Sequence, residues 1–263
     1  MPSQAWFEPK IAHTTQALEA GDGCHPDEAK ALSDYLNGTI DSPEAAREFT
    51  APVLSDANPP QQLYRIWALL SESLVELTAE ERHKTLDLMS AIQALPPSSG
   101  VDWSDLTGFA SMWDTLYRLH LHGPDGWEKD VDSFSEEKMR DFREDYDAVG
   151  TAEAEMFVRG IDAVVHENWG FKVLNLVCSE RKGLDIFLSE IYAWLRFAGA
   201  ELKKKVNWVQ IDGTSPSPEW RSDGETTAVH WETWKRELLK LSEDDNRLSE
   251  KGRKLAAECY KLM

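Results

Sequence analysis

The most constraining feature of the sequence is the segment 59–97, which two prolines close at each end. Apolar residues recur inside it at helical spacing in two runs, and the break between the runs carries Thr78 and, three residues later, Glu81. A threonine and a glutamate at this spacing form a capping box, which starts a helix. Pro96 and Pro97 lack amide donors and end the second helix. The segment therefore predicts an antiparallel pair of helices joined by a very short loop.

Similar start and stop signals recur along most of the chain. Pro26 and Pro43 stand where the first turn of a helix is expected, and Pro52 follows a run that should end near Thr50. Gly150, with the residue after it, indicates a further boundary between helices. Other helices are expected to begin near residues 102, 133, 151, 184, 227 and 249.

Strand signals are nearly absent. Only 171–178 (FKVLNLVC) fits either a short strand or a buried helix, and we favour the helix because its neighbours are helical. The sequence therefore predicts an all-α fold of about ten helices. We expect residues 26–263 to form one compact domain, with a long loop over 207–225 before the two C-terminal helices. Residues 1–25 are expected to form an N-terminal arm that either lies on this domain or is flexible.

The most apolar helix is expected over 184–204. Apolar residues cover more than half of its circumference, which is typical of a helix at the centre of a fold. Gly199 lies in its interior, where glycine is less favourable than alanine by about 1 kcal/mol. We expect a packing reason for this glycine, either a close crossing with another helix or space for a ligand. The 59–97 hairpin is the expected packing partner of this helix.

Charge and cysteine content limit the function. The chain of 263 residues carries 28 basic and 47 acidic residues, a net charge of −19. This charge opposes binding to nucleic-acid phosphates and to anionic membrane surfaces. Three widely spaced cysteines indicate free thiols in a reducing compartment. Because the chain also lacks an apolar run that could span a bilayer or act as a secretory signal, we expect a cytoplasmic protein that binds neither nucleic acid nor membranes.

Familiar catalytic and cofactor motifs are missing. The sequence has no glycine-rich phosphate loop, no GxSxG serine and no HExxH zinc pair. His120 and His122 are the nearest approach to a metal pair, but two residues apart on a helix their rings point about 200° away from each other. We therefore predict no metal and no cofactor.

The candidate site consists of polar or aromatic side chains on otherwise apolar helices. Arginine is rarely buried unpaired. If Arg65 pairs with Glu190 or Glu201 across a helix interface, the pair is either a structural ion pair or the polar end of a pocket. The eleven tryptophans suit a bulky core, their ordinary role, or the wall of a ligand cavity. The pocket candidates are Arg65, Trp67, Trp194, Glu201, Trp231 and Trp234.

Four stretches together resemble one protein family. They are SPEAAREFTAPV (42–53), QLYRIWALLSESL with KTLDLMSAIQALPP (62–97), AWLRFAGAEL (193–202) and the C-terminal HWETWKRELL segment (230–263). In this order they are similar to a widespread fungal family of helical proteins catalogued as a domain of unknown function, over about residues 26–263. The resemblance implies a compact α-helical fold and an intracellular fungal origin, and it implies no catalytic residue.

Two functions follow as hypotheses. We favour a non-catalytic module that binds a protein partner or an apolar small molecule, because catalytic motifs are missing and the helices are rich in tryptophan. The alternative is an enzyme of a fungal specialised-metabolite pathway, with acid or base groups such as Arg65, Glu201 or a histidine in a tryptophan-lined pocket. The site is expected where the 59–97 hairpin meets the 184–204 helix, with the Trp231–Trp234 helix closing it.

Overall fold

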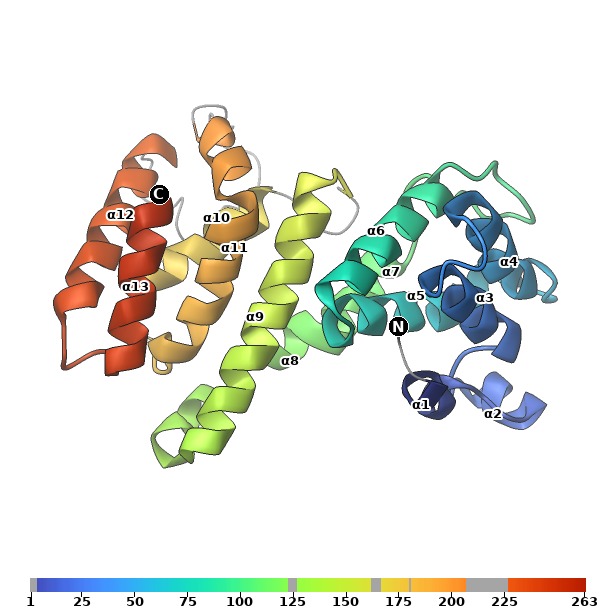
Figure 1. The fold of residues 1–263 in the computed structure, drawn as a ribbon, viewed down its shortest axis with the longest axis horizontal. Coiled ribbons are helices and arrows are strands. Elements are labelled where there is room, and N and C mark those ends of the chain that lie inside the picture. Colours follow the sequence, from blue (N-terminus) through green and yellow to red (C-terminus); the bar gives the residue numbers. More distant parts are fainter. Residues whose placement is uncertain (1–3, 123–126, 162–166, 180, 207–226) are drawn as a thin grey trace. The chain divides into compact units, whose positions relative to one another are not determined.

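The computed structural model describes residues 4–122, 127–161, 167–179, 181–206 and 227–263. They group into two compact units, Met1–His122 and Gly123–Met263. Within the described residues, helices and irregular segments make up the whole fold and no strand is present (Figure 1). The all-α prediction is therefore confirmed. The loop expected over 207–225 lies outside the described residues, and a single domain over 26–263 stays a prediction.

The first unit, Met1–His122, is built around the predicted hairpin. Helix α3 packs on α4, α4 on α6, and α5 on both α6 and α7. A π-helical turn, Asp114–Arg118, joins the last two helices of the unit. The helices are α1 (Gln4–Phe7), α2 (Thr15–Ala20), α3 (Pro26–Leu36), α4 (Ser42–Leu54), α5 (Pro59–Glu76), α6 (Ala79–Gln93), α7 (Phe109–Trp113) and α8 (Leu119–His122).

The hairpin of α5 and α6 has the predicted capping box. The Thr78 hydroxyl accepts from the Glu81 amide at 3.4 Å, and the Glu81 carboxylate accepts from the Thr78 amide at 3.1 Å. These two bonds satisfy backbone donors that a helix start otherwise leaves free. The prediction of two helices with almost no loop is confirmed.

Residues 4–24 lie against α5. The ammonium of Lys10 is 2.8 Å from a carboxylate oxygen of Glu72 and 2.9 Å from one of Glu76. The Tyr64 hydroxyl donates to the Leu18 carbonyl at 3.1 Å. The N-terminal arm therefore packs on the body of its unit, which is one of the two expected arrangements.

Helix α4 ends later than predicted. Asp41 caps it, and it continues beyond Thr50 to Leu54 with Pro52 inside. The proline removes only one backbone hydrogen bond in the final turn, while the fully buried Phe49 and Val53 anchor that turn in the core. The extra turn carries residues that later form a pocket wall.

The second unit, Gly123–Met263, is organised by two long helices. Helices α9 and α11 pack along much of their length, and α13 packs on α11 and α12. The ambiguous stretch 171–178 is helical, as favoured. The elements are α9 (Glu136–Val158), α10 (Glu167–Asn175), α11 (Leu184–Lys205), α12 (Thr227–Glu243) and α13 (Glu250–Leu262), with short 3₁₀ turns at Trp127–Lys129, Val131–Ser133 and Leu176–Cys178. Among all described helices of the protein, none has the length and apolar character that crossing a membrane requires.

The glycines of the second unit have roles other than those expected. Gly150 does not end a helix: α9 runs through it. A Cβ there would lie 2.9 Å from Cγ and 3.1 Å from Cα of Glu190 in α11, so glycine permits a close helix crossing. A Cβ at Gly199 would meet only Leu195 of its own helix, at 3.7 Å. Of the two reasons expected for Gly199, a close crossing is therefore not found among the described residues, whereas such a crossing occurs at Gly150.

Candidate functional site

The six candidate residues divide between the two units. Arg65 and Trp67 belong to the first unit, whereas the other four belong to the second. A joint site that combines the hairpin with α11 and α12 therefore stays a prediction.

Trp67 is a core residue of the first unit. Its side chain is 1% exposed, and its indole N–H donates to the Thr107 carbonyl at 2.9 Å. Its ring centroid lies 6.3 Å from that of Trp103 and 5.7 Å from that of Phe109, both in edge-to-face geometry. These contacts are those of aromatic packing in a core.

The three tryptophans of the second unit are also buried, at 0% exposure for Trp194 and Trp234 and 3% for Trp231. The Trp234 indole donates to the side-chain oxygen of Asn175 at 2.9 Å, and its ring is 6.5 Å from that of Trp231. Three pockets found among the described residues of this unit are lined by other side chains. These tryptophans therefore form core, and no described contact makes them a cavity wall.

Glu201 lies at the surface of its unit. Its side chain is 44% exposed and accepts a hydrogen bond from the Lys204 ammonium at 2.6 Å. A pair of this kind, three residues apart on a helix surface, contributes little to stability. Glu201 is therefore a solvated partner of a lysine on its own helix.

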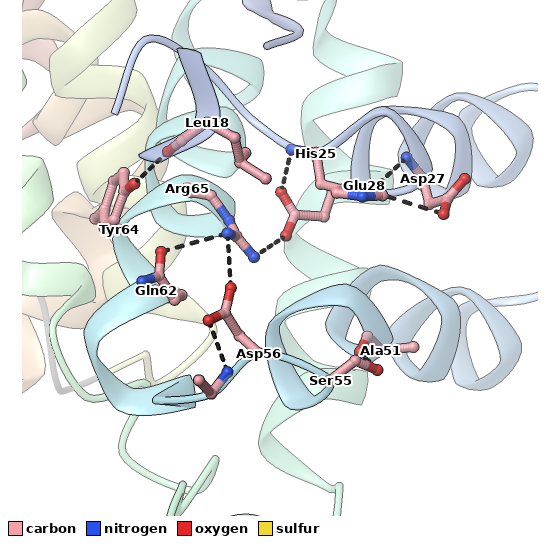
Figure 2. Close-up of polar contacts among 11 residues, drawn as sticks. Leu18, His25, Asp27, Glu28, Ala51, Ser55, Asp56, Gln62, Tyr64 and Arg65 are labelled. Atoms are coloured by element: carbon pink, nitrogen blue, oxygen red, sulfur yellow. Dashed lines mark hydrogen bonds and ion pairs between the residues drawn. The ribbon is translucent and has the colours of Figure 1, made fainter. Parts of the chain in front are cut away.

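Arg65 has different surroundings from the other five candidates. Its side chain is 2% exposed and comes from α5. Nη2 donates to Oε1 of Glu28 in α3 at 3.1 Å (Figure 2). Nη1 donates at 3.3 Å both to Oδ2 of Asp56, between α4 and α5, and to Oε1 of Gln62. We call Arg65, Glu28, Asp56 and Gln62 the Arg65 cluster.

Local backbone contacts hold both carboxylates of the cluster in place. Glu28 lies in the first turn of α3, where Oε2 accepts from the His25 amide at 2.7 Å. Asp56 follows the end of α4, and its Oδ1 accepts from the Ala57 amide at 2.8 Å. Each carboxylate thus binds a backbone N–H through one oxygen and Arg65 through the other. The cluster is pre-organised by the helix ends that carry it.

Burial shifts the ionisation of Glu28. Loss of hydration raises the pKa of this fully buried carboxyl from 4.5 to about 7, although the Arg65 charge and the His25 amide both act to lower it. The carboxyl therefore gains and loses its proton close to neutral pH. The cluster is correspondingly sensitive to pH.

An open pocket of about 770 Å³ lies beside the cluster, with Arg65 and Asp56 in its wall. The rest of its wall comes from α2, α3, α4 and the residues that join them: Thr15, Leu18, His25, Asp27, Lys30, Ala31, Glu48, Ala51, Pro52 and Ser55. Arg65 also lines a second pocket of about 330 Å³, together with Lys10 and Tyr64. Arg65 is therefore the residue that lines both pockets.

One donor of Arg65 has no partner. Its Nε–H is buried and makes no hydrogen bond, although both terminal nitrogens of the guanidinium do. A buried donor without a partner is unfavourable by about 1–3 kcal/mol. In addition, no group of three or more His, Cys, Asp or Glu side chains within the described residues is placed to hold a metal ion. The cluster thus combines fixed charges with one buried donor that has no partner.

Sequence reasoning did not name the partners that Arg65 has within its unit. The arginine is paired, as expected for a buried one, with Glu28 and Asp56, whereas Glu190 and Glu201 belong to the other unit. The signal for Glu28 was its position in the first turn of a helix begun by proline, where a glutamate binds the backbone amide before the helix. Its pairing with an arginine 37 residues later carries no sequence signal.

Comparisons of the chain with protein-family models, with curated proteins and with solved structures find no match. The resemblance to a fungal helical family therefore stays a prediction.

Proposed function

We propose that this protein is a non-catalytic, cytoplasmic binding module, and that the pocket beside the Arg65 cluster is its small-molecule site. The observation that carries the proposal is the cluster itself. A buried arginine held by two carboxylates stands in the wall of an open pocket of about 770 Å³. Fixed charges and a few polar groups in a concave wall are what small-molecule sites share.

The pocket wall favours a polar ligand over the apolar one expected from the sequence. It carries the charged side chains of Asp27, Lys30, Glu48, Asp56 and Arg65 among apolar ones such as Leu18, Ala51 and Pro52. None of the candidate tryptophans belongs to it. An apolar ligand would leave these charges desolvated without partners, which is unfavourable.

The alternative function, an enzyme, has one observation in its favour. A carboxyl that titrates near pH 7 is suited to general acid or base catalysis. However, Glu28 does not line the pocket, and both of its oxygens already accept hydrogen bonds. Because a substrate in the pocket would not reach this carboxyl, we favour binding without catalysis.

A thermal-shift screen of polar metabolites on the full chain tests the proposal. Ala51 is exposed and lines the pocket, so Ala51→Trp should fill the pocket without disturbing the core. Arg47→Trp, four residues earlier on the same helix and outside the pocket, is the control. We expect at least one compound to raise the melting temperature of the wild type and of the control, but not of Ala51→Trp.

Two results would contradict the proposal. One is that no compound stabilises the wild type. The other is that every stabilising compound acts equally on Ala51→Trp, which would place binding elsewhere. Turnover of a stabilising compound, followed by mass spectrometry, would instead favour the enzyme.

A further inference from the structure

We propose that residues 14–22, with helix α2 at their centre, are a hinged lid over the pocket beside the Arg65 cluster. The lid opens as a unit while both of its ends stay fixed to the body of the first unit. The opening itself is independent of the proposed function, whereas the role of the lid as a gate for a ligand rests on that function.

The two ends of the lid are bound to each other. The Ala12 amide donates to the Cys24 carbonyl at 2.9 Å, and the Cys24 amide donates to the Lys10 carbonyl at 2.8 Å. Ala12 and Cys24 are both buried, and the Lys10 ammonium is held by Glu72 and Glu76 of α5. We call these two backbone bonds the base of the lid. The chain thus leaves and rejoins the body at one place, which is the geometry of an Ω-loop.

Two glycines connect the lid to its base. Gly23 has a φ of +144°, and a Cβ there would lie 2.6 Å from the Lys10 carbonyl oxygen and 2.9 Å from the Ala12 amide nitrogen. Only glycine therefore allows the two ends to approach so closely. Gly21 ends α2 with a φ of +81°. Since glycine has the widest range of backbone conformations, this end of the lid is suited to act as a hinge.

The middle of the lid is weakly held. The side chains of α2 are all exposed or half-buried. Among the described residues, one hydrogen bond joins residues 14–22 to the rest of the protein, from the Tyr64 hydroxyl to the Leu18 carbonyl at 3.1 Å (Figure 2). A helix of six residues is too short to be stable alone in water. When the lid leaves the body, its internal hydrogen bonds therefore break with it.

The lid belongs to the walls of both pockets that Arg65 lines. Thr15 and Leu18 line the pocket of about 770 Å³, and Gly21 and Asp22 line the pocket of about 330 Å³. Displacement of residues 14–22 therefore removes a part of both walls at the same time. Segments with few buried contacts are the ones that open locally in a folded protein, and lids are drawn from them.

Hydrogen exchange of the full chain without ligand, followed by nuclear magnetic resonance, tests the proposal. The amides of Leu18, Gly21 and Asp22 donate hydrogen bonds inside the lid. We expect these three amides to exchange through one shared opening and therefore to be protected to a similar degree. They should exchange at least about tenfold faster than the amides of Ala12 and Cys24 at the base.

A matched pair of variants tests the bond that holds the lid. Tyr64→Phe removes this bond and keeps the ring, so the lid amides should exchange about two- to tenfold faster while the base amides are unchanged. Tyr117→Phe is the control, because the Tyr117 hydroxyl also donates to a carbonyl, that of Ser71 in α5, at 3.3 Å. The control should leave exchange in the lid unchanged, and melting temperatures verify that both variants fold.

Three results would overturn the proposal. The first is equal protection of the lid and the base, which would mean that the lid has no opening of its own. The second is faster exchange of the base together with the lid in Tyr64→Phe, which would mean that the whole N-terminal arm detaches. The third is an equal effect of the two tyrosine variants on the lid.

The measurement is separate from the test of the proposed function, because it uses no ligand. If the lid opens as described and no compound depends on the pocket, the lid stands and the proposed function fails. If the lid amides behave like those of the base while a compound acts in a way that Ala51→Trp abolishes, the lid fails and the proposed function stands.

Discussion

The Arg65 cluster and the tryptophan core of the second unit both bury polar hydrogens without partners. In the first it is the Nε–H of Arg65, and in the second the indole N–H groups of Trp194 and Trp231. The difference lies in the surroundings: Arg65 stands in the wall of a pocket, whereas Trp231 packs against the ring of Trp234 and lines none of the three pockets found among the described residues of its unit. A buried donor without a partner therefore does not by itself indicate a binding site.

The largest expected effect tests the packing role of the tryptophans. Trp234→Ala should lower the free energy of unfolding by about 3–5 kcal/mol, because it removes a fully buried indole and leaves a cavity. Leu239→Ala on the same helix is the control, since Leu239 is 41% exposed and its loss should change stability by about 0.5 kcal/mol or less. Urea unfolding followed by circular dichroism measures both. Similar effects for the two variants would contradict the assignment of Trp234 to the core.

The next effect tests the Arg65 cluster. Arg65→Ala should destabilise the protein by about 3 kcal/mol at pH 8, because it leaves a buried carboxylate without its counter-charge. At pH 5.5 Glu28 is already protonated in the wild type, so the loss should be smaller there. Urea unfolding at the two pH values measures this difference. A loss that does not depend on pH would mean that the arginine does not compensate the charge of Glu28.

Glu28→Gln tests the pH dependence directly. The pKa of Glu28 is about 7 in the folded protein, above its ordinary value of 4.5, so the folded state binds more protons than the unfolded state between these values. Glu28 should therefore lower the free energy of unfolding of the wild type by about 2–3 kcal/mol as the pH rises from 5 to 7.5. Glu28→Gln lacks this contribution. The other titratable groups contribute equally to the free energy of unfolding of both proteins, so their contributions cancel when the two pH profiles are subtracted. If the free energies of unfolding of wild type and variant changed with pH in parallel, the raised pKa of Glu28 would be refuted.

The smallest effects test the packing of the second unit. Gly150→Ala should destabilise the protein by about 1–3 kcal/mol, because its Cβ would lie 2.9–3.2 Å from atoms of Glu190. Gly199→Ala places a methyl group in ordinary contact, and the better helix propensity of alanine should stabilise α11 by up to about 1 kcal/mol. Thermal unfolding of the two variants shows whether each substitution stabilises or destabilises the protein. Effects of the same sign would contradict the crossing at Gly150.

Local signals in the sequence predict much of the helical framework. The capping box at Thr78 and Glu81, and the apolar pattern over 184–204, depend only on neighbours in the chain, and the structure has both features. A residue that is compatible with two local structures predicts the fold less well. A glycine can end a helix or permit a close crossing, and at Gly150 the packing of α11 decides between them. A proline near a helix end can be tolerated, as Pro52 is in α4.

The candidate site was predicted only in part. Arg65 was identified because a charged residue on an apolar helix needs a partner, and it has partners. The identity of those partners depends on how α3 and the end of α4 meet α5, which is tertiary information. The tryptophans were candidates on composition alone, and bulky aromatic residues serve equally well as core. Their complete burial favours the ordinary role.

The central claim is that ligand binding belongs to the Arg65 pocket and that the tryptophan core has a packing role. Nuclear magnetic resonance of the ¹⁵N-labelled chain tests it, with the strongest compound from the thermal screen as the titrant. We predict that the backbone amides of Ala51, Ser55 and Arg65 shift on titration, while the indole signals of Trp231 and Trp234 do not. Shifts of those two indole signals, with unchanged amides around Arg65, would contradict the account.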